Sequence, residues 1–155
     1  LPAGAYSFTS CRLNASSANH RPVVLDAGWN FGGYYSGHYD DVSLGVTMKL
    51  KGYATLALDA NLVRGRMPQG RFSENVYQVK ADIFLSPDLG LMNYIQFDDI
   101  SNTLGWSARL RWQITPGNEI YLVYNKNWER TWDPMSRFAP LGDRVVVKIS
   151  LSIRP

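Results

Sequence analysis

Alternating apolar and polar residues dominate this chain, most clearly over residues 104–125. Before the segment 115–118, every second residue is apolar: Trp106, Ala108, Leu110, Trp112 and Ile114. The residues between them are polar or charged: Ser107, Arg109, Arg111 and Gln113. Because neighbouring side chains of a strand point to opposite faces, this stretch predicts a strand with one apolar and one charged face. The alternation resumes after 115–118, so residues 104–125 form a predicted β-hairpin.

The same alternation predicts eight strands from residue 22 onward. They cover 23–31, 41–50, 54–62, 77–85, 89–98, the two strands of 104–125, and 144–154. Residues 1–21 are less regular, and the alternation of Tyr6 and Phe8 with Ser7 and Thr9 permits a ninth strand, whereas 14–19 is expected to be a loop. Helical periodicity is absent. An antiparallel up-and-down meander is therefore the simplest topology.

The predicted connections alternate between short and long. Residues 51–52, 86–88 and 115–118 form short turns, and 32–40, 64–72, 99–104 and 127–142 form longer loops. Outer-membrane barrels combine short periplasmic turns with longer external loops. The lengths favour a membrane barrel, and they predict that the last strand ends on the periplasmic side.

A periodicity of two does not say what covers the apolar face. A soluble sandwich would bury it against a second sheet, whereas a membrane barrel would turn it to lipid between two belts of aromatic residues. Aromatic residues do recur near the predicted strand ends, and we expect these to be interface residues: Trp29, Tyr77, Trp106, Trp112, Tyr124 and Trp128. The favoured fold class is an all-β, antiparallel, up-and-down transmembrane β-barrel, with eight or nine strands visible and part of a larger barrel.

Composition narrows the function classes. The chain has 155 residues and one cysteine, Cys11, so it has neither an internal disulfide nor a cysteine metal cluster. The net charge of +3 comes from scattered residues and does not predict nucleic-acid binding. The sequence contains no run of 18 apolar residues, so it predicts no transmembrane helix. The chain starts without Met or a signal-like segment, which suggests a processed protein or a piece of a longer one.

The polar face carries the residues that we expect to line the lumen: Asp59, Lys80, Asp82, Arg109, Arg111, Glu119 and Lys148. In a barrel of sixteen or more strands they would border a solute passage, and in an eight-stranded barrel they would pair and fill the interior. Asn93 breaks the apolar pattern, which predicts either a bulge or a contact with another chain.

Other charged residues suggest weaker candidates. His38, Asp40, Asp41, Asp98 and Asp99 match the residue types of omptin-like rim hydrolases but no motif of that class, so we expect no catalytic residues, metal or cofactor. A group of arginines in or beside the predicted outer loops suggests contacts with lipopolysaccharide phosphates: Arg64, Arg66, Arg71, Arg130, Arg137 and Arg144.

Three segments carry a resemblance to a known family. They read S-P-D-L from Ser86, N-Y-I-Q-F-D-D-I-S-N-T-L-G-W-S-A-R-L-R-W from Asn93, and P-G-N-E-I-Y-L-V-Y-N from Pro116. This region resembles the C-terminal β-barrel of a Gram-negative bacterial outer-membrane family whose N-terminal domain resembles a family 9 carbohydrate-binding module. The resemblance implies a piece of a longer outer-membrane protein and supplies no catalytic motif.

These observations together predict a porin-like segment of an outer-membrane barrel that serves solute passage or binding at the cell surface, including carbohydrate binding. The expected partners are outer-membrane lipid, lipopolysaccharide and another chain that completes or contacts the barrel. The alternatives are a closed eight-stranded structural or adhesive barrel and, less favoured, an omptin-like hydrolase.

Overall fold

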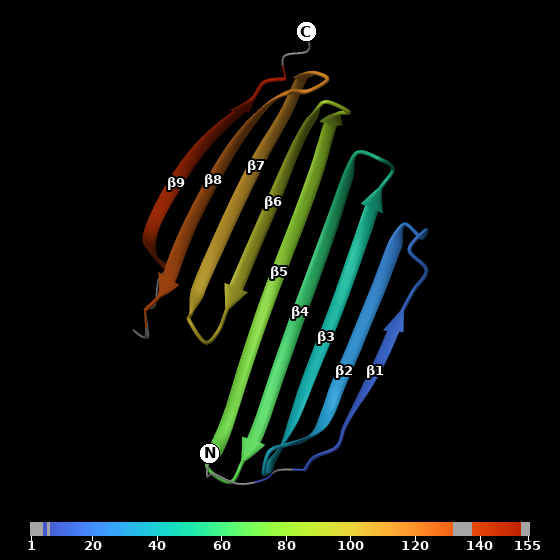
Figure 1. Ribbon diagram of the computed structural model, residues 1–155, viewed down its shortest axis with the longest axis vertical. Coiled ribbons are helices and arrows are strands. Elements are labelled where there is room, and N and C mark those ends of the chain that lie inside the picture. The colour runs from blue at the N-terminus through green and yellow to red at the C-terminus, as the bar shows by residue number, and fades with distance from the viewer. Residues whose placement is uncertain (1–4, 6, 132–137, 153–155) are drawn as a thin grey trace.

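In the computed structural model, the chain forms one antiparallel sheet of nine strands whose spatial order follows the sequence (Figure 1). The structure describes residues 5, 7–131 and 138–152. The strands are β1 Ser10–Ser16, β2 Val23–Tyr34, β3 Gly37–Leu50, β4 Ala54–Met67, β5 Gly70–Ser86, β6 Leu89–Asp98, β7 Thr103–Thr115, β8 Asn118–Arg130 and β9 Phe138–Ser150. The predicted all-β, antiparallel, up-and-down arrangement is confirmed.

The register follows the apolar alternation. Across β5 and β6, Tyr77 lies opposite Phe97, Val79 opposite Ile95 and Ile83 opposite Leu91. One pairing departs from a continuous register: the register shifts between Phe84 and Ser86, so Leu89 lies opposite Ser86 and not opposite Leu85. The hairpin predicted at 104–125 is β7 and β8, and the turn between them places Gly117 at a φ of 91°, which glycine adopts at little cost.

Two of the predicted long loops, 32–40 and 64–72, are mostly strand, which corrects the prediction, whereas 99–102 does form the turn between β6 and β7. β2 and β3 are joined by Tyr35 and Ser36 alone, and β4 and β5 by Pro68 and Gln69. Glycines are typical of breaks in a strand, but those of these segments fit within the ladder; the Phe72 ring lies over Gly65, for example, where a larger residue would collide with it. Connections are therefore short at both ends of these hairpins, and loop length no longer orients the sheet.

Two further boundaries differ from the prediction. β1 covers Ser10–Ser16 and pairs with β2 over its whole length, so residues 14–16, which we expected in a loop, are strand. β8 continues to Arg130 and β9 begins at Phe138, so much of the predicted loop 127–142 is also strand, with a register shift between Asn127 and Trp128.

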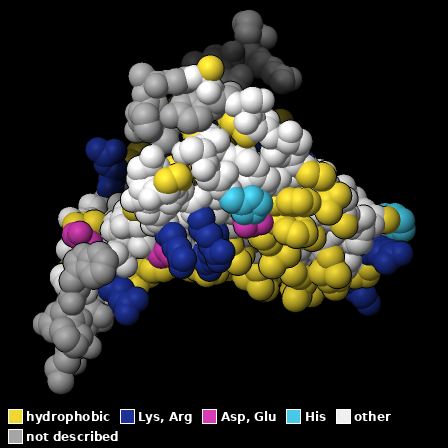
Figure 2. Space-filling model, turned by 90° about the horizontal axis from the view of Figure 1, so that it is seen from below, with side chains coloured by type: hydrophobic (Ala, Val, Ile, Leu, Met, Phe, Trp, Pro, Cys, Tyr) yellow, Lys and Arg dark blue, Asp and Glu magenta, His cyan; other side chains and the backbone are white. Residues whose placement is uncertain are grey.

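The sheet is not closed: β1 and β9 are its two edges. In Figure 1, β6–β9 are displaced upward along the strand direction relative to β1–β5, so the sheet is staggered. It has almost no core among the described residues, where Val24 is the one buried hydrophobic side chain. Hydrophobic side chains gather on one side of the molecule in the end-on view of Figure 2.

Candidate functional site: the polar face of the sheet

The register places all the predicted lumen residues on one face. Asp59 of β4 lies beside Gln78, and Lys80 and Asp82 follow on β5 at the same side-chain parity. The pairing of β5 with β6 and of β6 with β7 places Arg109 and Arg111 of β7 on the same face. The other two predicted lumen residues, Glu119 on β8 and Lys148 on β9, also lie on it. We call this face the polar face and the opposite one the apolar face.

A hollow of about 330 Å³ lies on the polar face of β1–β5. Its floor is low because Gly28 and Gly45 offer no side chains, while Asp26 and Asp59 lie on either side of Gly45 in register. A Cβ at Gly45 would come 3.1 Å from the Asp59 Oδ1, and one at Gly28 would collide with the Ser43 hydroxyl. The two glycines therefore create space that other residues would fill.

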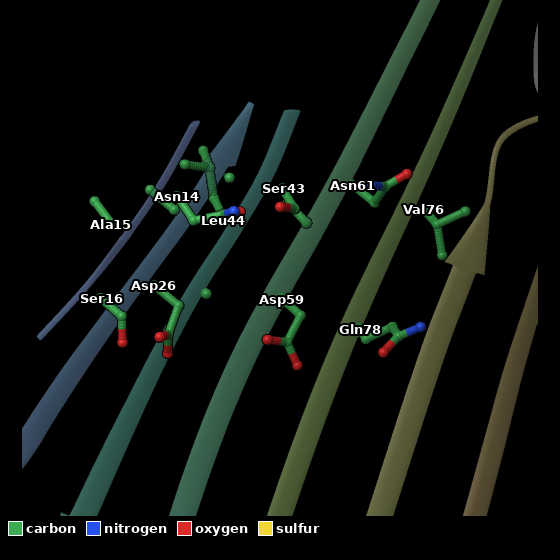
Figure 3. Close-up of a pocket in the computed structure, with 14 residues that line it drawn as sticks. Asn14, Ala15, Ser16, Asp26, Ser43, Leu44, Asp59, Asn61, Val76 and Gln78 are labelled. Atoms are coloured by element: carbon green, nitrogen blue, oxygen red, sulfur yellow. The ribbon is translucent and has the colours of Figure 1, made fainter. Parts of the chain in front are cut away.

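Figure 3 shows the polar side chains that border the hollow from neighbouring strands: Asn14, Ser16, Asp26, Ser43, Asp59, Asn61 and Gln78. They offer both hydrogen-bond donors and acceptors. The arrangement suits a hydrated, polar solute. The hollow was not predicted, although glycines at polar-face positions inside the predicted strands were the available signal.

The charged residues of this face pair along the sheet, between neighbouring strands. Lys80 Nζ lies 3.4 Å from Asp59 Oδ2, and both side chains are more than 40% exposed. Arg111 donates to Glu119, which also accepts from the Tyr121 hydroxyl. Among the described residues, no ion pair or side-chain hydrogen bond is present for Asp82 or Arg109, whereas Lys148 is attracted by the charge of Glu119. The charges of Asp82 and Arg109 remain available to a solute.

An aromatic group at one end of the polar face was also missed. The rings of Tyr34 and Tyr39 lie 5.6 Å apart, and Phe8 lies 6.3 Å from Tyr34. Asn30 donates to the Tyr39 hydroxyl, which ties this group to the polar network. Residues 32–40 were expected in a loop, so the sequence assigned their side chains to neither face.

The acidic residues considered for catalysis do not converge. His38 Nε2 lies 3.3 Å from Asp40 Oδ2, but Asp98 and Asp99 are on or beside β6, beyond β4 and β5. Asp98 accepts from the backbone amides of Ile100 and Ser101, and Asp99 accepts from Asn75. These contacts give Asp98 and Asp99 roles in the loop after β6.

On the apolar face, four of the predicted interface aromatics form an oblique line. Following the register from Trp29 of β2 leads to Asn75 of β5, and Tyr77 lies two residues further along that strand. Relative to the register position of Tyr77, Trp106 of β7 lies two residues further in the same direction along the strands. Tyr124 of β8 lies two residues further than Trp106 in that direction. The line thus rises six residues over six strand spacings. Trp112 lies near the other end of β7, and Trp128 lies below the line on β8.

Asn93 is accommodated without a bulge. It lies opposite Ala81 and Ala108 in an unbroken register, so the predicted bulge is wrong. Trp106 Nε1 donates to its Oδ1 over 3.4 Å, and its Nδ2 donates to the Ala81 carbonyl over 3.5 Å. The Trp106 indole, which lies diagonal to Asn93, is the hydrogen-bond partner that the sequence did not reveal.

The described part of the chain holds no group of three or more metal-ligating side chains placed to bind one ion. It contains no helix that is long and apolar enough to cross a membrane. Comparison with known proteins found no matching family model, no similar curated protein and no similar solved structure.

Proposed function

We propose that this chain forms part of the wall of an outer-membrane β-barrel, with its apolar face in lipid and its polar face lining a solute passage. The proposal rests on the two faces of the sheet and on their geometry. It also agrees with the resemblance of residues 86–126 to a bacterial outer-membrane family.

The exposure of the apolar face supports a lipid environment. Large hydrophobic side chains are open across the sheet, among them Leu25 at 54%, Leu44 at 49% and Val147 at 60%. Soluble monomers rarely expose contiguous apolar patches of more than a few hundred Å². A face of this kind has to be covered by another sheet, by a partner or by lipid.

The oblique line of aromatic residues favours lipid over a second sheet, and it is the observation that carries the proposal. A rise of six residues over six strand spacings corresponds to a tilt of roughly 35°, taking about 3.4 Å per residue and about 4.8 Å between strands. Strands of membrane barrels tilt by about 35–45° from the membrane normal, and their aromatic residues follow the membrane plane. The core of a soluble sandwich has no reason to arrange its aromatics along such a line.

The two sheet edges support a larger barrel. A strand edge with unpaired amides and carbonyls is unfavourable in lipid, so further strands must pair with β1 and β9. With nine strands present and no closure between them, an interior wide enough for a passage is favoured over a filled eight-stranded barrel.

Polarised infrared spectroscopy of the complete protein in oriented bilayers tests the membrane placement. We expect strands tilted by roughly 35–45° from the bilayer normal. A protein that stays in the aqueous phase, or whose strands lie in the bilayer plane, would contradict the placement.

Conductance of the complete protein in planar bilayers tests the passage separately. We expect a channel whose conductance falls in Gly28→Leu, because the new side chain enters the hollow. Ala108→Leu, on the apolar face, is the matched control and should conduct normally. A tilted, inserted protein without current would favour the structural or adhesive barrel.

A further inference from the structure

Three arginines gather on the apolar-face side of the β4–β5 hairpin, beyond the apolar residues. Arg66 of β4 lies directly opposite Arg71 of β5, and Arg64 lies two residues from Arg66 on the same face. All three are exposed. Figure 2, which looks at this end of the molecule, shows Lys and Arg side chains clustered beside a histidine and an acidic residue. We call these three residues the arginine cluster.

The arginine cluster lacks a neutralising acid. Like charges directly opposite each other destabilise a strand pair. Asp40, which faces Arg64 across β3 and β4, is engaged by His38 and by the Trp29 indole at 3.2 Å. Within the described ranges, no carboxylate lies within ion-pair distance of the three guanidinium groups, and Arg64 instead donates to Ser73. Such a cluster suits an external anion with several oxygens, and guanidinium groups bind phosphate in a bidentate manner.

The position of the cluster along the strands indicates the kind of anion. Leu62 is the last apolar residue of β4 on this face, and Arg66 lies four residues beyond it. At the tilt derived above, this places the Arg66 backbone roughly 11 Å beyond the apolar band. The headgroup zone of a phospholipid extends only about 5–8 Å past the hydrocarbon. A phosphorylated saccharide headgroup reaches further.

We propose that the arginine cluster binds the phosphate groups of a glycolipid with a phosphorylated saccharide headgroup, at the membrane surface beside the β4–β5 hairpin. This inference rests on the proposed membrane placement of the sheet. It narrows the six arginines suggested by the sequence to three: Arg130 is at the end of β8, Arg144 lies on the polar face, and Arg137 lies outside the described residues.

The test measures how tightly the complete protein, purified in detergent, binds purified lipopolysaccharide, the same lipopolysaccharide after enzymatic dephosphorylation, and phosphatidylglycerol. We expect the R66Q/R71Q double variant to bind lipopolysaccharide at least about tenfold more weakly, because hydrogen bonds between charged groups are lost. Dephosphorylated lipopolysaccharide should bind the unaltered protein with a similar loss. The R21Q/K51Q variant removes the same charge at the opposite end of the strands, and it should bind normally.

The outcomes distinguish a failure of the glycolipid-site proposal from a failure of the proposed membrane placement. Equal binding of phosphatidylglycerol and lipopolysaccharide would overturn the glycolipid assignment in favour of a general anionic lipid. Unchanged binding by R66Q/R71Q would overturn the site, provided that the variant inserts into vesicles with the normal strand tilt. Failure of the unaltered protein to insert into vesicles of either lipid would overturn the membrane placement, and the site with it.

Discussion

The two faces of the sheet share one backbone register but differ in how their side chains are satisfied. On the polar face, side chains bind across strands: Asn61 donates to Asp41 over 2.8 Å, and Lys80 pairs with Asp59. On the apolar face, side chains meet mainly through rings and aliphatic groups, as Trp106 and Tyr124 do at 5.4 Å between ring centroids. Asn93, a polar residue among the apolar side chains of this face, accepts a hydrogen bond from Trp106.

This difference indicates which interactions stabilise the sheet. The polar face is compatible with water, since its groups pair with each other or remain exposed. The apolar face gains little free energy from the described residues alone, because Val24, the one buried hydrophobic side chain, lies on the polar-face side. The hydrophobic contribution to the stability of the sheet therefore depends on what covers the apolar face. A charged substitution should lower the free energy of unfolding much more on the apolar face than on the polar face.

The largest effect should follow a charge placed in the middle of the apolar face. Val79→Arg puts a guanidinium between Leu58 and Ile95, and it should lower the free energy of unfolding in lipid vesicles by about 2–4 kcal/mol. Gln78→Arg changes the adjacent residue on the polar face, beside Asp59, and should cost less than about 1 kcal/mol. Denaturant titration of both variants in vesicles measures the difference.

A similar cost at both positions would break the comparison, because the two faces would then be equally exposed to water or equally packed. A large cost for Gln78→Arg alone would reverse it and place lipid on the polar face.

The sequence predicts the register well because a shift of one residue would turn an apolar side chain to the polar face. The pairs Tyr77–Phe97 and Val79–Ile95 follow from this rule alone. The strand ends are harder to predict, because the extensions beyond the apolar band are polar and contain glycines such as Gly65. A local pattern does not show that the Phe72 ring covers that glycine.

The first strand and the candidate site were also only partly predictable from the local sequence pattern. Cys11, Leu13 and Ala15 do alternate with polar residues, but β1 is only 7 residues long, and its small side chains resemble those of a loop. The polar-face charges could be assigned to one face from their parity. The hollow was not assigned, because parity shows which face a residue takes but not that Gly45, between Asp26 and Asp59, leaves open space there.

A second prediction concerns Asn93, a polar residue among the apolar side chains of the apolar face. Asn93→Leu removes an amide whose two hydrogen bonds are long, at 3.4 and 3.5 Å, and adds apolar surface facing lipid. We expect the variant to raise the free energy of unfolding in vesicles by about 1 kcal/mol. Gln96→Leu, on the polar face of the same strand, should not stabilise the protein. Destabilisation by Asn93→Leu, together with a change in sedimentation, would show instead that Asn93 contacts another chain.

The smallest expected effect lies in the ion pair of the polar face. Lys80 and Asp59 are 48% and 42% exposed, so water screens their attraction, and Lys80 also lies 6.0 Å from the centre of the Tyr94 ring. A double-mutant cycle with Lys80→Met and Asp59→Asn should therefore give a coupling free energy of only about 0.2–1 kcal/mol. Its magnitude should fall as salt is raised, because ions reach an open aqueous face. A coupling well above this range and insensitive to salt would mean that the polar face is dry, which would argue for a filled interior in place of a solute passage.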